Sequence, residues 1–220
     1  MHKRFYLRWL IILGILLPAL TGCGGSDGPV FVEPGLIGID DRPAVAITAP
    51  ELTVEYALPG FPGTTVVSIL SDQPTDGHIA FDPFLNSFTI TNGPDTLLFG
   101  VDSADPNEPE FRAFLDFPLN GSTGGPTIPL NAIIVAADLT VFVNSVEFAS
   151  RIPVLVDLVE YSVLTGPTES DYFPPPLAVQ TVNFFSSDEG FDVVIDVTSL
   201  MSAAQNFGLL DFQVRLLVEP

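Results

Sequence analysis

The placement of proline and glycine is the feature that most restricts the fold of this chain. The sequence holds 21 Pro and 18 Gly in 220 residues, and they divide its Val, Ile, Leu and Phe into short runs. Such residues favour strands, and proline and glycine mark the turns between them. Only residues 199–207 have helical spacing, with Thr198 or Ser199 placed to cap them. The pattern predicts an all-β fold, a β-sandwich or jelly roll with one short helix near the C-terminus.

The expected strands follow one another from about residue 64 to the C-terminus. Residues 92–95, Asn-Gly-Pro-Asp, are typical of a hairpin turn. Residues 111–117 alternate, so Phe111 and Leu115 are expected on one face and Arg112 and Asp116 on the other. The expected strands are 65–70, 87–91, 96–102, 111–117, 132–146, 152–163, 191–197 and 212–218, with weaker candidates at 44–49 and 52–58.

The first 23 residues have the layout of a secretory signal peptide. Basic residues at positions 3, 4 and 8 precede an apolar stretch from Trp9 to Leu20, and small residues follow it. A membrane-spanning helix needs about 20 apolar residues, and this run is shorter and contains Pro18. The run ends in Leu-Thr-Gly-Cys, which includes Cys23, the one cysteine of the chain. An ordinary signal peptide with an incidental cysteine is the alternative interpretation.

The ending Leu-Thr-Gly-Cys resembles the lipobox of bacterial lipoproteins. The resemblance implies that residues 1–22 are removed and that Cys23 becomes a lipidated N-terminus, held in the membrane by its acyl chains. Gly24 follows the cysteine, which by similarity to enteric sorting rules favours the outer membrane. Residues 23–63 are dense in Gly, Pro and Asp, which predicts a flexible tether. The folded domain is expected over residues 64–220, at the cell surface.

The chain is strongly acidic. Its formal net charge is −20, and after residue 22 only four arginines and no lysine stand against 27 carboxylates. A charge of this sign repels nucleic acids, which argues against DNA or RNA as a partner. No second cysteine is present, so no internal disulfide can form and the hydrophobic core must provide the stability.

Several segments, in order, resemble the DNRLRE-type β-sandwich domain, a relative of carbohydrate-binding modules. The resemblance covers roughly residues 65–220 and implies a sandwich fold. This chain has Ala203 or Ala204 where the family often has a tryptophan, and residues 164–190 carry no family signature. The matching segments are Asp-Gly-His-Ile at 76–79, Leu-Leu-Phe-Gly at 97–100, Arg-Ala-Phe-Leu-Asp-Phe at 112–117, residues 134–143, and Asp-Val-Thr-Ser-Leu at 196–200.

The residue types left after cleavage restrict catalysis. His78 is the only histidine, and lysine is absent, which excludes Cys-His and Ser-Lys nucleophiles and a His-rich zinc site. We expect His78 to be a half-buried strand residue. Two carboxylates alone can hydrolyse a glycosidic bond, but no pair stands out in the sequence. The chain is therefore expected to be non-enzymatic, with a carboxylate-based glycan hydrolase or lyase as the alternative.

Acidic loops are candidates for a calcium site, because this cation takes six to eight oxygen ligands. The first loop spans residues 102–110 and offers Asp102, Asp105, Glu108 and Glu110. A second runs from Ser187 to Asp192. The spacing is not that of an EF-hand, and the prolines of the first loop are also typical of a stiff, solvated loop. Calcium is the one cofactor that the sequence puts forward.

Aromatic and basic residues supply the remaining candidates. Tyr172 and Phe173 lie near expected loops and are candidate ligand-binding residues, either as a platform or as a protein-contact patch. Filling of the core is the alternative role. The three arginines of the expected strands, Arg112, Arg151 and Arg215, are expected to pair with carboxylates such as Asp116 or Asp138 across neighbouring strands.

These observations predict a lipid-anchored protein of the cell envelope whose domain is a non-catalytic binding or structural module. Its expected partners are the membrane, through the anchor, and a glycan or another envelope protein.

Overall fold

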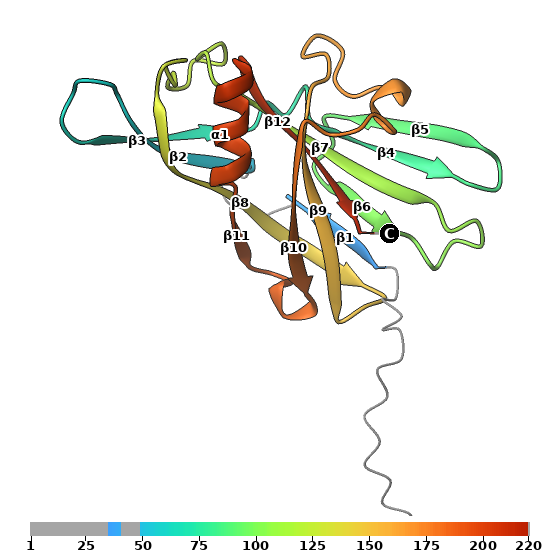
Figure 1. Ribbon diagram of the computed structural model, residues 1–220. Helices are drawn as coiled ribbons and strands as arrows, with labels where there is room; N and C mark the ends of the chain where they lie inside the picture. Colours follow the sequence, from blue (N-terminus) through green and yellow to red (C-terminus); the bar gives the residue numbers. More distant parts are fainter. Residues whose placement is uncertain (1–34, 41–48, 220) are drawn as a thin grey trace, which may run out of the picture. The chain divides into compact units, whose positions relative to one another are not determined.

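Twelve antiparallel strands and one helix form the described part of the chain in the computed structural model, which covers residues 35–40 and 49–219 (Figure 1). These residues belong to the second of two compact units, Val32–Pro220; the first, Met1–Phe31, lies outside the described residues. The strands are β1 (Leu36–Ile39), β2 (Glu51–Ala57), β3 (Thr64–Leu70), β4 (Gly77–Asp82), β5 (Ser87–Asn92), β6 (Leu97–Val101), β7 (Glu110–Pro118), β8 (Ile133–Glu147), β9 (Arg151–Val159), β10 (Ala178–Phe185), β11 (Asp192–Asp196) and β12 (Asp211–Val218), with helix α1 (Thr198–Phe207) and the one-turn 3-10 helices η1 (Glu169–Asp171) and η2 (Ser186–Asp188).

The strands form one continuous sheet in the order β10-β9-β12-β7-β6-β1-β8-β2-β3, with β11 also paired to β8 and the β4–β5 pair attached to β7. Strand β8 is 15 residues long, and it connects the strands from β10 to β1 with β2, β3 and β11. Its C-terminal end pairs with β1, whereas its N-terminal part pairs with β2 and β11.

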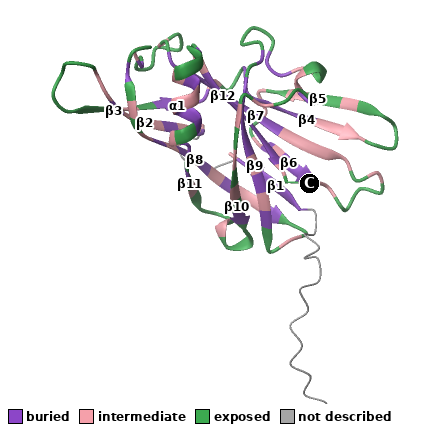
Figure 2. Ribbon diagram, in the orientation of Figure 1, coloured by how far each residue is buried: buried purple, intermediate pink, exposed green. Residues whose placement is uncertain are grey.

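The sheet curls until distant strands face each other. Phe99 of β6 and Phe184 of β10 lie four places apart in the strand order, yet their ring centroids are only 5.5 Å apart. In a flat sheet four steps of about 4.8 Å would separate the two strands by roughly 19 Å. The enclosed core runs along the central strands (Figure 2). The predicted all-β fold with one short helix is confirmed as a curled antiparallel sheet, and this strand order does not establish a jelly roll.

Helix α1 packs its apolar face against the sheet and ends at a glycine. Leu200, Met201 and Ala204 are buried, and Gly208 ends the helix in the left-handed region at φ 71°. The expected cap is wrong, because Thr198 is already helical. Its hydroxyl instead accepts the N–H of Ala137 at 2.9 Å and ties the helix to β8. No helix in the described ranges is long and apolar enough to cross a membrane.

The sheet begins earlier in the chain than the sequence predicts. Strand β1 is buried between β6 and β8, and β2 alternates buried and half-buried residues beside β8. The prediction of a flexible tether over residues 23–63 therefore does not hold for β1 and β2, which belong to the sheet. Strand β1 has four residues, too few for a periodic pattern, whereas β2 largely coincides with the weaker strand candidate at 52–58. Of the expected strand at 44–49, residues 44–48 lie outside the described residues, as do the signal peptide and Cys23.

The hairpin expected at residues 92–95 does not form. Strand β5 pairs with β4, and β6 pairs with β1 and β7 instead of with β5. The reason is burial, because Leu97 and Phe99 of β6 are needed in the main core, whereas β5 is largely exposed. Strand β10 was missed in a region dominated by proline and phenylalanine.

Candidate functional site

Strand β7 is buried on both faces, and this organises the part of the protein with the densest polar contacts. Its inner face joins the main core, as the alternation predicts. On its outer face Phe114 packs in a second, smaller cluster with Ile79, Val159, Tyr161 and Tyr172. Tyr161 and Tyr172 belong to the segment between β9 and β10, residues 160–177, which we call the covering segment. It lies over what would otherwise be a solvent-exposed sheet face.

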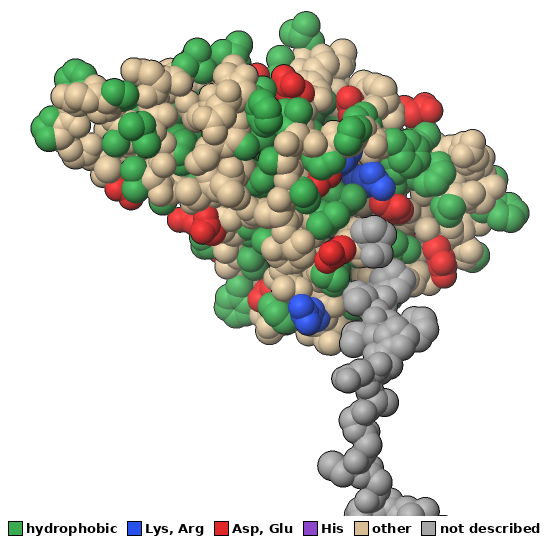
Figure 3. Space-filling view, viewed as in Figure 1, with side chains coloured by type: hydrophobic (Ala, Val, Ile, Leu, Met, Phe, Trp, Pro, Cys, Tyr) green, Lys and Arg blue, Asp and Glu red, His purple; other side chains and the backbone are tan. Residues whose placement is uncertain are grey.

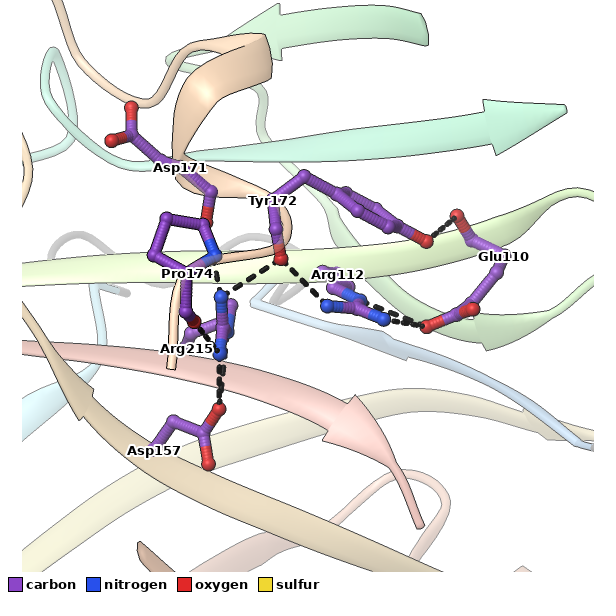
Figure 4. A network of polar contacts seen from close by, with 7 residues as sticks. All are labelled: Glu110, Arg112, Asp157, Asp171, Tyr172, Pro174 and Arg215. Atoms are coloured by element: carbon purple, nitrogen blue, oxygen red, sulfur yellow. Dashed lines mark hydrogen bonds and ion pairs between the residues drawn. The ribbon is translucent and has the colours of Figure 1, made fainter. Parts of the chain in front are cut away.

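Arg215 holds the covering segment to the sheet (Figure 4). It stands opposite Asp157 on β9 and donates to Oδ2 of that carboxylate from Nη2 at 2.6 Å and from Nε at 3.1 Å. It also donates to the backbone carbonyls of Asp171, Tyr172 and Pro174 at 2.8–3.0 Å. Both charged side chains are 3% exposed. The expected cross-strand pairing is found for Arg215, with Asp157 as partner in place of Asp116 or Asp138.

Arg112 fixes Tyr172 from its other side. Its Nη1 donates to the carbonyl of Tyr172 at 2.6 Å, and its guanidinium carbon lies 3.9 Å from the centre of the tyrosine ring. Glu110 binds the same guanidinium at 2.8 Å and accepts the tyrosine hydroxyl through its backbone carbonyl. Burial raises the pKa of Tyr172 above its ordinary value. The third strand arginine, Arg151, donates to Asn183 on β10.

Tyr172 and Phe173, the two predicted ligand-binding residues, have opposite environments. Tyr172 is fully buried, so it supports the surface and does not form it, whereas Phe173 is 64% exposed. The rings of Phe81, Phe88, Tyr172 and Phe173 lie with centroids 4.9–5.9 Å apart. Hydrophobic side chains gather there beside a basic one (Figure 3). We call the exposed Phe173 together with the half-buried Phe81 and Phe88 the Phe173 surface.

The acidic loop at 102–110 does not gather its carboxylates. Asp102 and Asp105 accept the backbone N–H groups of Ala104 and Asn107 at 3.0 and 2.8 Å, and Glu110 binds Arg112. No group of three or more His, Cys, Asp or Glu is placed to hold a metal ion within the described ranges, Glu108 and the Ser187–Asp192 loop included. One oxygen each of Asp102, Asp105 and Glu110 thus serves a local contact within the protein.

Two buried carboxylates were not anticipated from the sequence. Asp76 is 2% exposed and accepts the N–H of Asp116 at 2.8 Å, and Asp116 is fully buried and accepts the hydroxyl of Thr75 at 3.0 Å. Burial raises the pKa of Asp76 to about 7 and that of Asp116 to about 6. Nothing in the alternation of β7 distinguishes Asp116 from a solvated residue, because the contacts that hold it come from outside the strand, from residues 72–76.

His78 lies on strand β4 as expected, but at 9% exposure it is buried and not half-buried. Its Nδ1 accepts the N–H of Leu98 at 3.4 Å, and burial lowers its pKa. The imidazole therefore serves a structural contact.

Comparison with known proteins finds no matching family model, no matching curated protein and no matching solved structure. The resemblances to lipoproteins and to DNRLRE-type domains thus remain predictions from the sequence.

Proposed function

We propose that this chain is a lipid-anchored protein of the cell envelope whose β-domain is a non-catalytic binding module, and that the Phe173 surface is its contact site. The proposal rests on one observation: Phe173 is exposed, and the backbone of the residue before it is held in place by hydrogen bonds. Phe173 follows Tyr172 directly, and the carbonyl of Tyr172 accepts hydrogen bonds from both Arg112 and Arg215.

A fixed aromatic ring is well suited to binding. Aromatic side chains dominate the energy of many interfaces, and a surface that is already ordered loses little conformational entropy on association. Phe173 contacts Phe81 and Phe88 from β4 and β5, so its position depends on the sheet and not on the loop alone. The partner expected from the sequence is a glycan or another envelope protein.

Burial argues against Asp76 and Asp116 as the catalytic pair of a glycan hydrolase or lyase. A glycosidase needs two carboxylates that reach the substrate. Asp76 and Asp116 have the raised pKa that suits a general acid, but both are enclosed and bonded within the protein. The hydrolase alternative would need another pair of carboxylates that reaches the solvent, and a glycan-degrading activity that survives Asp76→Asn with Asp116→Asn would support it.

The contact surface is tested by Phe173→Ala with Phe191→Ala as the matched control. The two residues are the same type and equally exposed, at 64% and 65%, and Phe191 lies just before β11, away from the Phe173 surface. Binding of the full-length protein to purified envelope polysaccharides and to cross-linked envelope proteins is measured. We expect a loss of about tenfold or more for Phe173→Ala only, because a truncated hot spot costs about 2 kcal/mol. Equal binding by both variants would contradict the proposal.

The anchor is tested separately, by intact mass of the membrane-extracted protein. We expect cleavage before Cys23 with acyl groups added, and release from the membrane fraction for Cys23→Ala. An unmodified thiol in the extracted protein would contradict lipidation and leave the binding site untouched.

A further inference from the structure

A pocket of about 590 Å³ opens beside the C-terminal end of α1, where the chain turns into β12. Its volume falls in the range of small-molecule sites. Three parts of the chain build it: the start of the covering segment, Leu177 just before β10, and the turn from α1 into β12. Its lining includes Glu160, Leu164, Leu177, Phe207, Leu210 and Asp211.

Part of the wall of this pocket is apolar and exposed, beside its polar lining residues. Leu164 is 92% exposed, Phe207 57% and Leu210 55%, and Val163 and Leu177 are about 40% exposed. Covering such carbon surface stabilises a complex by about 25 cal/mol per Å² of apolar area removed from water. The walls therefore favour a ligand with an apolar body.

The charge of the pocket has one sign. Its two carboxylates are Glu160 and Asp211, and no lysine, arginine or histidine lines it. Burial, and to a smaller extent the negative charge of Asp72, raises the pKa of Asp211. A bound cation would offset these unfavourable effects, and no basic residue lines the pocket to do so. The three arginines within the described ranges bind elsewhere, to Glu110, Asn183 and Asp157.

The C-terminal end of α1 adds partial negative charge to the pocket. Phe207 and Gly208 line the pocket, and they are the last residue and the cap of the ten-residue helix. A helix C-terminus carries roughly half a negative charge, which favours a cation, and the last turn of α1 has no basic residue to offset it.

We propose that this pocket binds a small organic amine, with its ammonium group at Glu160 and Asp211 and its apolar body along Leu177 and Phe207. Charge complementarity selects the ligand head, and the exposed apolar walls select the ligand body. The site is separate from the Phe173 surface and does not depend on the function proposed for it.

The experiment compares three probes that share one apolar body: 3-phenylpropylamine, 3-phenylpropan-1-ol and 3-phenylpropanoate. Binding to the full-length protein in detergent is measured by isothermal titration calorimetry. We expect the amine to bind at least ten times more tightly than the alcohol, and the carboxylate not to bind. Equal affinity for amine and alcohol, or no binding of the amine at millimolar concentration, would overturn the proposal. So would binding of a lysine-rich peptide in place of the amine.

Variants locate the site. Asp211→Asn and Glu160→Gln each should reduce the preference for the amine over the alcohol several-fold, and Phe207→Ala should weaken both probes equally. Glu169→Gln removes a charge from an exposed acid of the covering segment that does not line the pocket, and should change nothing. Glu160 is an exposed rim residue, so Glu160→Gln keeps the test valid if Asp211→Asn fails to fold. An unchanged preference in Glu160→Gln and in every folded Asp211→Asn sample would place the amine elsewhere and overturn the proposal.

Discussion

Asp76 and Asp116 make the stability of this protein depend on pH. Their pKa values rise on folding, from the ordinary value near 4 to about 7 and about 6. Between pH 4 and 7 the unfolded chain has released these protons, whereas the folded protein still binds them. The free energy of unfolding therefore falls as pH rises through this window and levels off above pH 7.

The expected decrease is on the order of 4 kcal/mol for a carboxyl group shifted by about three units. Urea unfolding at several pH values between 4 and 8 measures it. Asp76→Asn keeps an oxygen that can accept the N–H of Asp116, and removes the charge. We expect this variant to lose a large part of the slope and to be more stable than the parent at pH 8. A parallel pH profile in the variant would contradict the assignment.

Gly100 is required by the close approach of two strands. Its φ is +119°, and a Cβ placed there would overlap the backbone carbonyl of Gly35 beside β1. Gly124 also has a positive φ, at +82°, but a Cβ there would meet no atom within 4 Å. Gly124→Ala is expected to cost about 1 kcal/mol of stability for the left-handed backbone, and Gly100→Ala clearly more. Chemical denaturation of both variants separates backbone strain from overlap, and equal losses would contradict the overlap.

At the scale of elements, the covering segment depends on one buried ion pair. Arg215→Ala would leave Asp157 charged and buried, and removal of one partner of such a pair costs about 3–5 kcal/mol. We expect hydrogen exchange of residues 160–177 to rise before that of the central strands. Arg112→Ala should have a smaller effect, because its partner Glu110 is 34% exposed and keeps contact with water.

The double substitution Arg215→Met with Asp157→Leu distinguishes the orphaned charge from the lost contacts. It removes both charges and fills similar volume, so part of the stability lost in Arg215→Ala should return. The carbonyls of residues 171–174 would still lack a donor, so exchange in the covering segment should stay raised. Full protection of that segment in the double variant would contradict the role of Arg215 as its clamp.

Elements with strong alternation were predictable, and elements decided by distant partners were not. Strand β12 was expected at 212–218 and lies at 211–218, because Phe212, Val214 and Leu216 alternate on the core face. The pairing of β5 and β6 was mispredicted, because turn residues favour a hairpin but burial of Phe99 beside β1 outweighs them. The alternation of apolar residues along a strand does not indicate which other strands it pairs with or packs against in a curled sheet.

The candidate sites show the same division. Residue type and position suggest Phe173 as a ligand-binding residue, which stays a prediction, whereas charge and strand position predict the cross-strand pairing of Arg215 that the structure shows. Hydrogen bonds from Arg112 and Arg215 to the carbonyl of Tyr172 hold the residue before Phe173 in place. Because the acceptor is a backbone atom, the residue types do not predict these bonds. The pocket near α1 combines residues 160–164 with residues 207–213, which no local pattern connects.

At the scale of the whole molecule, the domain includes strands that precede residue 64. Ile37 and Ile39 of β1 are fully buried, as are Leu52 and Val54 of β2. A chain that begins at Thr64 would expose the core of β6 and β8 and lose several fully buried side chains at about 1.5–3 kcal/mol each.

We expect the chain that begins at Val32 to unfold cooperatively and the chain that begins at Thr64 not to. Near-ultraviolet circular dichroism and thermal melting compare the two. The expectation of a long flexible tether makes the opposite prediction, that both chains have the same melting temperature.

The position of β1 also sets the order in which the protein can assemble. This strand is synthesised before every other strand that the structure describes, but it pairs with residues 97–100 and 143–147, which follow much later. Contacts between residues distant in the chain form slowly, and unpaired apolar strands are prone to aggregate until they form. Residues Leu36–Ile39 therefore cannot complete their strand pairing until β8 has been synthesised. A chain that crosses a membrane N-terminus first would arrive with its folding still to be completed on the far side.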